Sequence, residues 1–228
     1  MNRIMAVMAC EVCAGVWVAH AGEIQGRVKI IEGLTKQRVS TPAYQSRGIF
    51  VAPGRSGSGV VDELSRVVVY LEVPLPAAVN PVTAELKQRN RRFEPEVVAV
   101  PVGSSVSFPN ADPIFHNVFS LSKAKQLDLG HYPSGQSRTI RFDKPGVVEL
   151  YCHLHPNMNA VVLVLPGAFY TRPGADGTFQ VAGVPAGHYK IVAWHKSAGL
   201  LRRSIQVPEN GVVHIDFEIP AVDADAVR

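Results

Sequence analysis

The 228-residue sequence predicts an all-β protein, and three features of its composition and patterning support this fold class. The chain holds 17 prolines and 19 glycines, residues that form turns and interrupt helices. Its apolar residues lie in short valine-rich runs, and no stretch has the pattern of a long amphipathic helix. The runs recur at short intervals with turn residues between them, which is typical of an antiparallel sandwich.

The overall composition is that of an ordinary globular protein. Hydrophobic residues make up 46% of the chain and charged residues 18%, and the formal net charge is +4. The length is sufficient for one large domain or two small ones. No nucleic-acid-binding motif is present, so we expect no nucleic-acid partner.

Residues 1–21 are predicted to be a secretory signal peptide. Arg3 supplies the positive start, the following stretch is mostly apolar, and Ala19-His20-Ala21 fits the small-x-small cleavage rule. A membrane anchor is one alternative, but Glu11 and the short length make a poor span, which needs about 20 mainly apolar residues. A lipoprotein signal ending at Cys10 is another, although few residues precede this cysteine. We therefore expect a periplasmic or secreted protein without a membrane span.

The first strands are predicted before residue 82. Residues 23–31 alternate apolar and polar side chains, which indicates a strand with one face in water. Residues 33–60 are weakly patterned and end in a glycine- and serine-rich stretch, a flexible loop by composition. Residues 67–71 form a more buried strand. Three prolines between residues 74 and 81 then break the chain, because proline cannot donate to a sheet ladder, so we place a domain boundary there.

Residues 82–166 are predicted to form a sandwich of their own. A basic turn between two short strands is expected within residues 86–93, where Lys87, Arg89, Arg91 and Arg92 cluster around Asn90. The further strands are predicted at residues 97–102, 106–108, 115–121, 139–142, 147–152 and 160–165.

Residues 167–220 form a second β stretch, and residues 221–228 are interpreted as a tail. The dipeptide Asp176-Gly177 is a hairpin turn signal. Strands are predicted at residues 179–181, 189–194, 204–207 and 212–219.

The loop between two of these strands, Tyr151 to Met158, gathers unusual chemistry. Without the signal peptide the chain keeps one cysteine, Cys152, and one methionine, Met158, and His155 lies between them. A trigonal set of two histidines and one cysteine, with a distant methionine, is the blue-copper arrangement. The second histidine must come from elsewhere in the chain, and His116 is the candidate.

Residues 82–166 resemble a cupredoxin, the Greek-key blue-copper sandwich of amicyanin and plastocyanin. The Cys-x-x-His-x-x-Met spacing resembles the short ligand loop of amicyanin. The other matching features are Val102–Phe108, Asn110, His116–Val118, Gly146 and Tyr151-Cys152. The resemblance implies one type 1 copper ion, with His116, Cys152 and His155 as strong ligands and Met158 as the weak axial one. It also implies that Asn117 holds the two ligand loops together near the cysteine sulfur.

The ligand loop departs from the amicyanin pattern at one position. Amicyanin-like loops carry proline just before the second histidine, whereas this chain has Leu154. We expect the Leu154 N–H to donate to the Cys152 sulfur, to lower the charge on the thiolate and to raise the reduction potential. Leu154 and Pro156 also flank His155, which is expected to lie at the surface in an apolar patch and to act as the electron port.

Residues 167–220 resemble the last part of a carboxypeptidase-regulatory, prealbumin-like domain. The motifs that carry this resemblance are Asp176–Phe179, Gly183–Ile191 and Ala193–His195. Such domains begin with a Gly-x-Val strand and a valine-rich strand, and residues 26–28 and 67–71 fit these. Residues 22–81 and 167–220 are therefore predicted to form one smaller sandwich with the cupredoxin inserted, since fifty-odd residues alone would make a thin core.

These observations predict a monomeric one-electron carrier rather than an enzyme, whose partner is another redox protein such as a cytochrome or a dehydrogenase. Copper storage or delivery is an alternative, and a metal-free binding module that works through the second sandwich is another. His153 resembles the histidine that relays electrons to a second copper in some enzymes. Those sites need further histidine pairs, so we interpret His153 as a solvated loop residue. The basic group at residues 87–92 is either a solvated turn or a docking site for an acidic partner.

Overall fold

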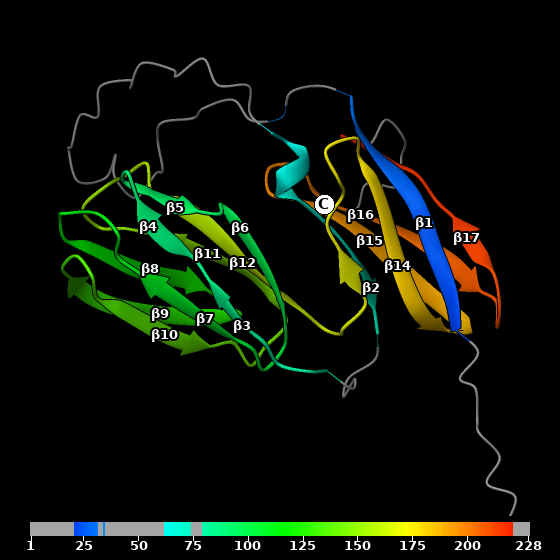
Figure 1. Cartoon of the computed structure of the whole chain (residues 1–228), viewed down its shortest axis with the longest axis horizontal. Coiled ribbons are helices and arrows are strands. Elements are labelled where there is room, and N and C mark those ends of the chain that lie inside the picture. Colours follow the sequence, from blue (N-terminus) through cyan, green and yellow to red (C-terminus); the bar gives the residue numbers. More distant parts are fainter. Residues whose placement is uncertain (1–20, 32–33, 35–61, 74–78, 221–228) are drawn as a thin grey trace, which may run out of the picture.

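The computed structural model describes residues 21–31, 34, 62–73 and 79–220. Over these residues the chain is built of strands, with a single turn of 3-10 helix at Leu64–Arg66 (Figure 1). This confirms the predicted all-β class and sandwich architecture. No helix in the described segments is long and apolar enough to cross a membrane. The predictions for the signal peptide up to residue 20, for the glycine- and serine-rich loop and for the C-terminal tail lie outside the described residues.

The first sandwich contains one five-stranded sheet in the order β6-β12-β11-β8-β9 and one three-stranded sheet in the order β10-β7-β3, with a two-stranded ribbon of β4 and β5. Its strands are β3 Thr83–Glu85, β4 Lys87–Arg89, β5 Arg92–Glu94, β6 Val97–Pro101, β7 Ser105–Pro109, β8 His116–Ser122, β9 Lys125–Tyr132, β10 Ser137–Arg141, β11 Gly146–Tyr151 and β12 Asn159–Leu165. Two of its pairs, β6 with β12 and β3 with β7, are parallel, so the sandwich is mixed rather than purely antiparallel.

The second sandwich contains a sheet in the order β14-β1-β17, with β18 also on β1, and a sheet in the order β13-β2-β15-β16. Its strands are β1 Ala21–Ile30, β2 Val67–Glu72, β13 Tyr170–Thr171, β14 Thr178–Pro185, β15 Gly187–His195, β16 Gly199–Val207, β17 Val212–His214 and β18 Phe217–Ile219. Strands from both sides of residues 82–166 therefore pair with each other, β1 with β14 and β2 with β15. These pairings support the proposal that residues 22–81 and 167–220 form one sandwich into which the cupredoxin-like segment is inserted.

Two local predictions in this sandwich need correction. Asp176-Gly177 does form a turn, in which the Gly177 N–H donates to Gly174 O at 2.9 Å, but it is not a hairpin turn. The strand before it, β13, pairs with β2 in one sheet, and the strand after it, β14, pairs with β1 in the other. The predicted strand at residues 212–219 is also interrupted, because the Asp216 side chain takes the place of a ladder partner and accepts the Arg27 N–H at 2.7 Å.

Glycine is required where the Asp176-Gly177 turn approaches β1. A Cβ atom at Gly177 would lie 2.2 Å from the carbonyl oxygen of Val28, and the φ angle of Gly177 is +83°. Both the space and the backbone conformation exclude a larger residue. A second close approach occurs within the motif that suggested this sandwich, since a Cβ at Gly26 would lie 1.7 Å from the Ile215 carbonyl oxygen.

The two sandwiches pack against each other through β12, which explains why this strand is a continuous apolar run. All of its residues after Asn159 are buried. Alternate side chains point into the core of the first sandwich, and the others face the second sandwich. The buried residues at this contact are Val97, Val161, Leu163 and Leu165 from the first sandwich and Val68, Val192 and Trp194 from the second. A strand buried on both faces is expected to lack polar alternation. In Figure 1, β2 lies on the side of the second sandwich that faces the first.

Polar side chains rim this contact and reach the ligand loop. Lys196 donates to Asn159 Oδ1 at 2.8 Å and to Glu96 Oε2 at 3.1 Å, and Arg66 lies 2.7 Å from the same Glu96 oxygen. Burial lowers the pKa of Lys196, and the Glu96 carboxylate opposes this change. Asn159 directly follows Met158, so Lys196 of the second sandwich is hydrogen-bonded to the residue next to a predicted ligand.

The shared sheets lead to a prediction about fragments of the chain. A fragment of residues 167–228 is expected to stay unfolded, because its two sheets would lack β1 and β2, which lie inside them. Thermal unfolding followed by circular dichroism should show a cooperative transition for the full chain and none for the fragment. A fragment that unfolds cooperatively would contradict the inserted arrangement.

Candidate metal centre

The sheet order of the first sandwich brings the predicted ligands together. The strands β8 and β11 are neighbours, and Tyr151 at the end of β11 pairs with Phe119 of β8. The residue after β11 is Cys152, and the residue at the start of β8 is His116. Because antiparallel neighbours place the end of one strand beside the start of the other, this pairing puts Cys152 next to His116.

The cysteine and both histidines form one compact cluster. The Cys152 sulfur lies 3.9 Å from Nδ1 of His116 and 3.8 Å from Nδ1 of His155. The three ligand atoms all lie within 4.8 Å of one another. Cys152 and His116 are fully buried, His155 is half-buried, and its ring centroid lies 4.7 Å from that of His116. Met158 is fully buried in the same core cluster as Cys152.

Asp112 orients His116 and was not identified from the sequence. Its Oδ2 atom lies 2.7 Å from Nε2 of His116, and the carboxylate also accepts the backbone N–H groups of Asn90 at 2.6 Å and Arg91 at 2.8 Å. Burial raises the pKa of Asp112, but the hydrogen bonds from Arg91, His116 and Asn90 outweigh it, so the pKa is lowered. An ionised carboxylate only accepts, so Nε2 of His116 donates to Asp112, and Nδ1 is the nitrogen that faces Cys152. An acid four residues before the candidate histidine was the available sequence signal.

The loop that carries Asp112 is folded around Asn110. The Asn110 side chain donates to Ile114 O at 2.8 Å and to Tyr132 O at 3.1 Å, and its Oδ1 accepts the Asp112 N–H at 3.0 Å. These bonds fix the backbone from residue 110 to residue 116 against β9. The loop that carries Asp112 and leads to His116 is thus held in place by one buried side chain.

Asn117 joins the two ligand loops, as its predicted role requires. Its Oδ1 accepts the backbone N–H of His153 at 3.4 Å, and its Nδ2 donates to Asp128 Oδ1 at 2.7 Å and to Gly130 O at 3.2 Å. The hydrogen bond from the Gly130 N–H is the main reason why the pKa of Asp128 is lowered, with the Asn117 amide adding to it against the effect of burial. The amide of Asn117 is therefore held by β9 and holds the ligand loop.

His155 is the ligand candidate nearest the surface. Burial lowers its pKa, the charges of His116 and Arg91 lower it further, and Asp112 opposes them. The ring is therefore neutral near pH 7, the form in which histidine binds metals. Its neighbour Leu154 is 49% exposed and Pro156 is half-buried, and the apolar patch around His155 stays a prediction. Donation from the Leu154 N–H to the Cys152 sulfur stays a prediction.

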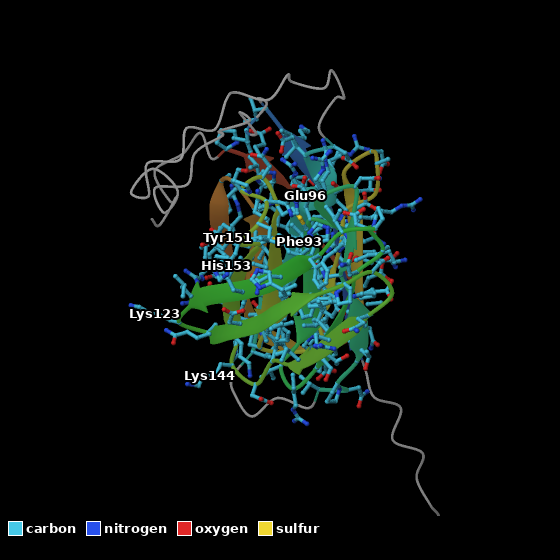
Figure 2. All side chains as sticks on the ribbon, turned by 90° about the vertical axis from the view of Figure 1, so that its left-hand side faces the viewer. Phe93, Glu96, Lys123, Lys144, Tyr151 and His153 are labelled. Atoms are coloured by element: carbon cyan, nitrogen blue, oxygen red, sulfur yellow. The ribbon has the colours of Figure 1, made fainter. Side chains whose placement is uncertain are left out.

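His153 lies outside the cluster. Its exposed ring packs on Phe119 with 4.0 Å between ring centroids, and His131 lies 6.3 Å away. Figure 2 shows His153 next to Tyr151 on one edge of the first sandwich. His195 is buried near the contact between the sandwiches, where it bonds Glu63 at 3.2 Å and accepts backbone N–H groups. This matches a packing role, and His188 and His214 are exposed.

The donor set fits a soft metal ion. Within residues 21–31, 34, 62–73 and 79–220, His116, Cys152 and His155 are the one group of at least three histidine, cysteine or acidic side chains close enough to share an ion. A buried thiol with two imidazole nitrogens directed towards it, and a buried thioether in the same cluster, is the set that copper sites use. A hard ion such as Mg²⁺ would require oxygen ligands instead.

Comparisons with known proteins found partial similarities that cover 36% of the chain. No family model matches the chain. Amicyanin-alpha of Methylorubrum extorquens is 28% identical over 85 residues, which cover 36% of this chain and 71% of that protein. A purple cupredoxin from Nitrosopumilus maritimus is a solved structure with 24% identity and a TM-score of 0.33, covering 36% of this chain and 98% of its own. A reduced amicyanin mutant has 22% identity and a TM-score of 0.34, with 36% and 81% covered. The prealbumin-like resemblance of the second sandwich stays a prediction.

The contact between Asp112 and His116 generates a prediction about affinity. Replacing Asp112 by alanine frees the His116 ring and both backbone donors of the β4–β5 turn, so Cu(I) affinity should fall about 10- to 100-fold. Competition with a chromogenic Cu(I) chelator measures this change. Asp143→Ala removes an exposed carboxylate that pairs with Arg141 and serves as the matched control. Equal affinities of the two variants would show that Asp112 does not position the ligand.

Proposed function

We propose that this chain is a periplasmic or secreted type 1 copper protein that carries single electrons. The observation that carries this proposal is the buried Cys152 sulfur with the Nδ1 atoms of two histidines at 3.8 and 3.9 Å. The sequence similarity to an amicyanin supports it. Copper held at such a site supplies a one-electron couple between Cu(I) and Cu(II).

The residues of the chain have distinct roles in this proposal. Cys152, His116 and His155 hold the ion, and Met158 is its weak axial ligand. Cys152 binds as a thiolate, because a bound cation deprotonates its coordinating thiol. His116 is fixed by Asp112, and the bonds of Asn117 hold the cysteine loop against β8 and β9. Ligands fixed by the fold move little between the two oxidation states, which favours fast transfer.

His155 is the proposed entry and exit point for electrons. Of the four ligand candidates it alone has exposed surface, since His116, Cys152 and Met158 are each fully buried. A partner can therefore approach the site most closely over this ring. We propose another redox protein, such as a cytochrome or a dehydrogenase, as that partner. The chain has no Cys-x-x-Cys-His sequence, so any c-type haem belongs to the partner.

Copper storage or delivery is the rival function, because it would use the same ligands. The half-buried position of His155 is the feature that favours it, since a ligand at the surface gives an ion a route to a receiving protein. The two functions differ in kinetics. A carrier keeps its ion while it cycles between Cu(I) and Cu(II), whereas a delivery protein gives Cu(I) up readily to a chelator. A metal-free binding module would keep its function in a Cys152→Ala variant.

The first prediction of this proposal concerns the visible spectrum. The mature protein loaded with Cu(II) should show an intense blue band from thiolate-to-copper charge transfer, and Cys152→Ser should abolish it. Absorption spectroscopy with copper analysis of both samples makes the measurement. A pale spectrum with weak bands in a copper-containing wild-type sample would remove Cys152 from the site and with it the carrier function.

The second prediction concerns the reduction potential. Leu154→Pro removes the backbone N–H that is expected to donate to the Cys152 sulfur. The thiolate then keeps more charge and stabilises Cu(II), so the potential should fall. Voltammetry of the two proteins decides, with Leu154→Ala as the control that keeps the N–H. An unchanged or higher potential in Leu154→Pro contradicts the hydrogen bond.

A further inference from the structure

The hairpin of β4 and β5 carries three arginines on its outer side. Its inward residues, Gln88 and Phe93, are fully buried, and Gln88 bonds the Tyr132 hydroxyl and Phe108 O. The outward pair nearest the turn is Arg89 and Arg92, which lie directly opposite each other. Arg91 is in the turn itself, and all three arginines are exposed.

The placement of these arginines opposes the stability of the hairpin. Like charges directly opposite each other on a strand pair are destabilising. Asn90 and Arg91 have φ angles of +54° and +56°, and glycine is the favoured residue at the second of these positions. Within the described segments no ion pair of the three arginines offsets the cost of this backbone conformation. Residues that break a local rule in this way mark functional positions.

The structure connects the turn to the metal centre. The Asp112 carboxylate accepts the Asn90 N–H at Oδ1 and the Arg91 N–H at Oδ2, and the same Oδ2 atom bonds Nε2 of His116. The backbone of the turn is therefore one side chain away from a ligand. The ring centroid of His116 in turn lies 4.7 Å from that of His155. Positive charge is thus fixed beside the proposed electron port.

Exposed apolar side chains lie next to the ligands on the same two loops. Phe115 is 55% exposed and precedes His116, Leu154 is 49% exposed and precedes His155, and Ile114 is 40% exposed. Large apolar side chains at the surface, rimmed by charge, indicate a protein interaction site. Aromatic residues and arginine are the residue types enriched in such interfaces.

We propose that the arginine tip, defined as Arg89, Arg91 and Arg92, forms with Phe115 and Leu154 a docking surface for an acidic redox protein. The inference rests on the proposed carrier function and names the charge of its partner. Opposite charge steers such a partner towards His155, and the apolar side chains then exclude water at close contact. The positive charge of the arginine tip repels a basic partner from the same surface.

Binding of the full mature chain to two cytochromes tests the proposal. One acidic and one basic c-type cytochrome serve as probes, and NMR titration of the copper-free chain gives each Kd at low and high salt. Copper-loaded protein is then used for stopped-flow electron transfer. The charge variant is Arg89→Gln/Arg91→Gln/Arg92→Gln. The control variant Lys123→Gln/Lys125→Gln/Lys144→Gln removes equal charge beyond the far end of β8, roughly 20 Å from His116 (Lys123 and Lys144, Figure 2).

The wild type and the lysine variant should bind the acidic cytochrome, and the arginine variant should lose about tenfold or more in affinity and in transfer rate at low salt. High salt should remove the difference. An arginine variant that behaves like the lysine variant, or a wild type that prefers the basic cytochrome, overturns the proposal. Binding to vesicles of phosphatidylglycerol through the same arginines, without affinity for the acidic cytochrome, overturns it as well and assigns the tip to a membrane surface.

A single variant separates docking from folding. Arg91→Gly relieves the strained turn, so its melting temperature should rise while its affinity for the acidic cytochrome falls. Greater stability with unchanged affinity would assign Arg91 no part in docking and contradict the proposal. The carrier function is tested separately. If binding depends on the arginines but the protein lacks the blue band, the docking surface is supported and the carrier function is contradicted. If the blue band is present but binding does not depend on the arginines, the carrier function is supported and the docking surface is contradicted.

Discussion

The carboxylate of Asp112 is the group on which the metal centre and its surroundings depend. Its two oxygens accept hydrogen bonds from two backbone N–H groups of the β4–β5 turn and from the His116 ring. These bonds fix the tautomer of a buried histidine, satisfy a turn with an unfavourable backbone and join the two into one rigid unit. A buried charge is tolerated when it is bonded in this way, and removing a partner leaves it uncompensated. The candidate ligand His116, the β4–β5 hairpin and the docking surface proposed on that hairpin therefore all depend on hydrogen bonds to this one carboxylate.

Most strands, and three of the four ligand candidates, could be predicted because their signals are local. Cys152, His155 and Met158 lie within one loop, and the alternating or apolar runs mark the strands. Asp112 could not be assigned, since its partners at residues 90 and 91 are far from it in sequence and meet it only through the fold. The strand β9 was missed because its apolar residues are few: Leu127 and Leu129 are only half-buried, and the buried Tyr132 stands at its very end.

The pairing partners of several strands could not be predicted from the sequence either, because pairing also depends on contacts between distant residues. The turn chemistry of Asp176-Gly177 predicts that the chain reverses, but which sheet takes each flanking strand depends on contacts made elsewhere. In this structure β13 pairs with β2 in one sheet, and β14 pairs with β1 in the other. The burial of β12 on both faces likewise follows from the second sandwich, which a run of valines and leucines does not specify. Long-range pairing decides such details, whereas periodicity decides whether a strand forms at all.

The insertion of one sandwich into another has a consequence for chain entropy. Tyr70 of β2 and Tyr170 of β13 lie side by side in one sheet, and the whole first sandwich lies between them in the sequence. While the outer sandwich stays folded, this segment can unfold only as a closed loop of roughly 100 residues. Closing a loop of that length lowers the entropy of the unfolded chain, which destabilises the unfolded state by about 4 to 5 kcal/mol, as much as a disulfide bond does. The second sandwich thus acts as a non-covalent cross-link for the first sandwich. The one cysteine among the described residues, Cys152, lies in the cluster with His116 and His155.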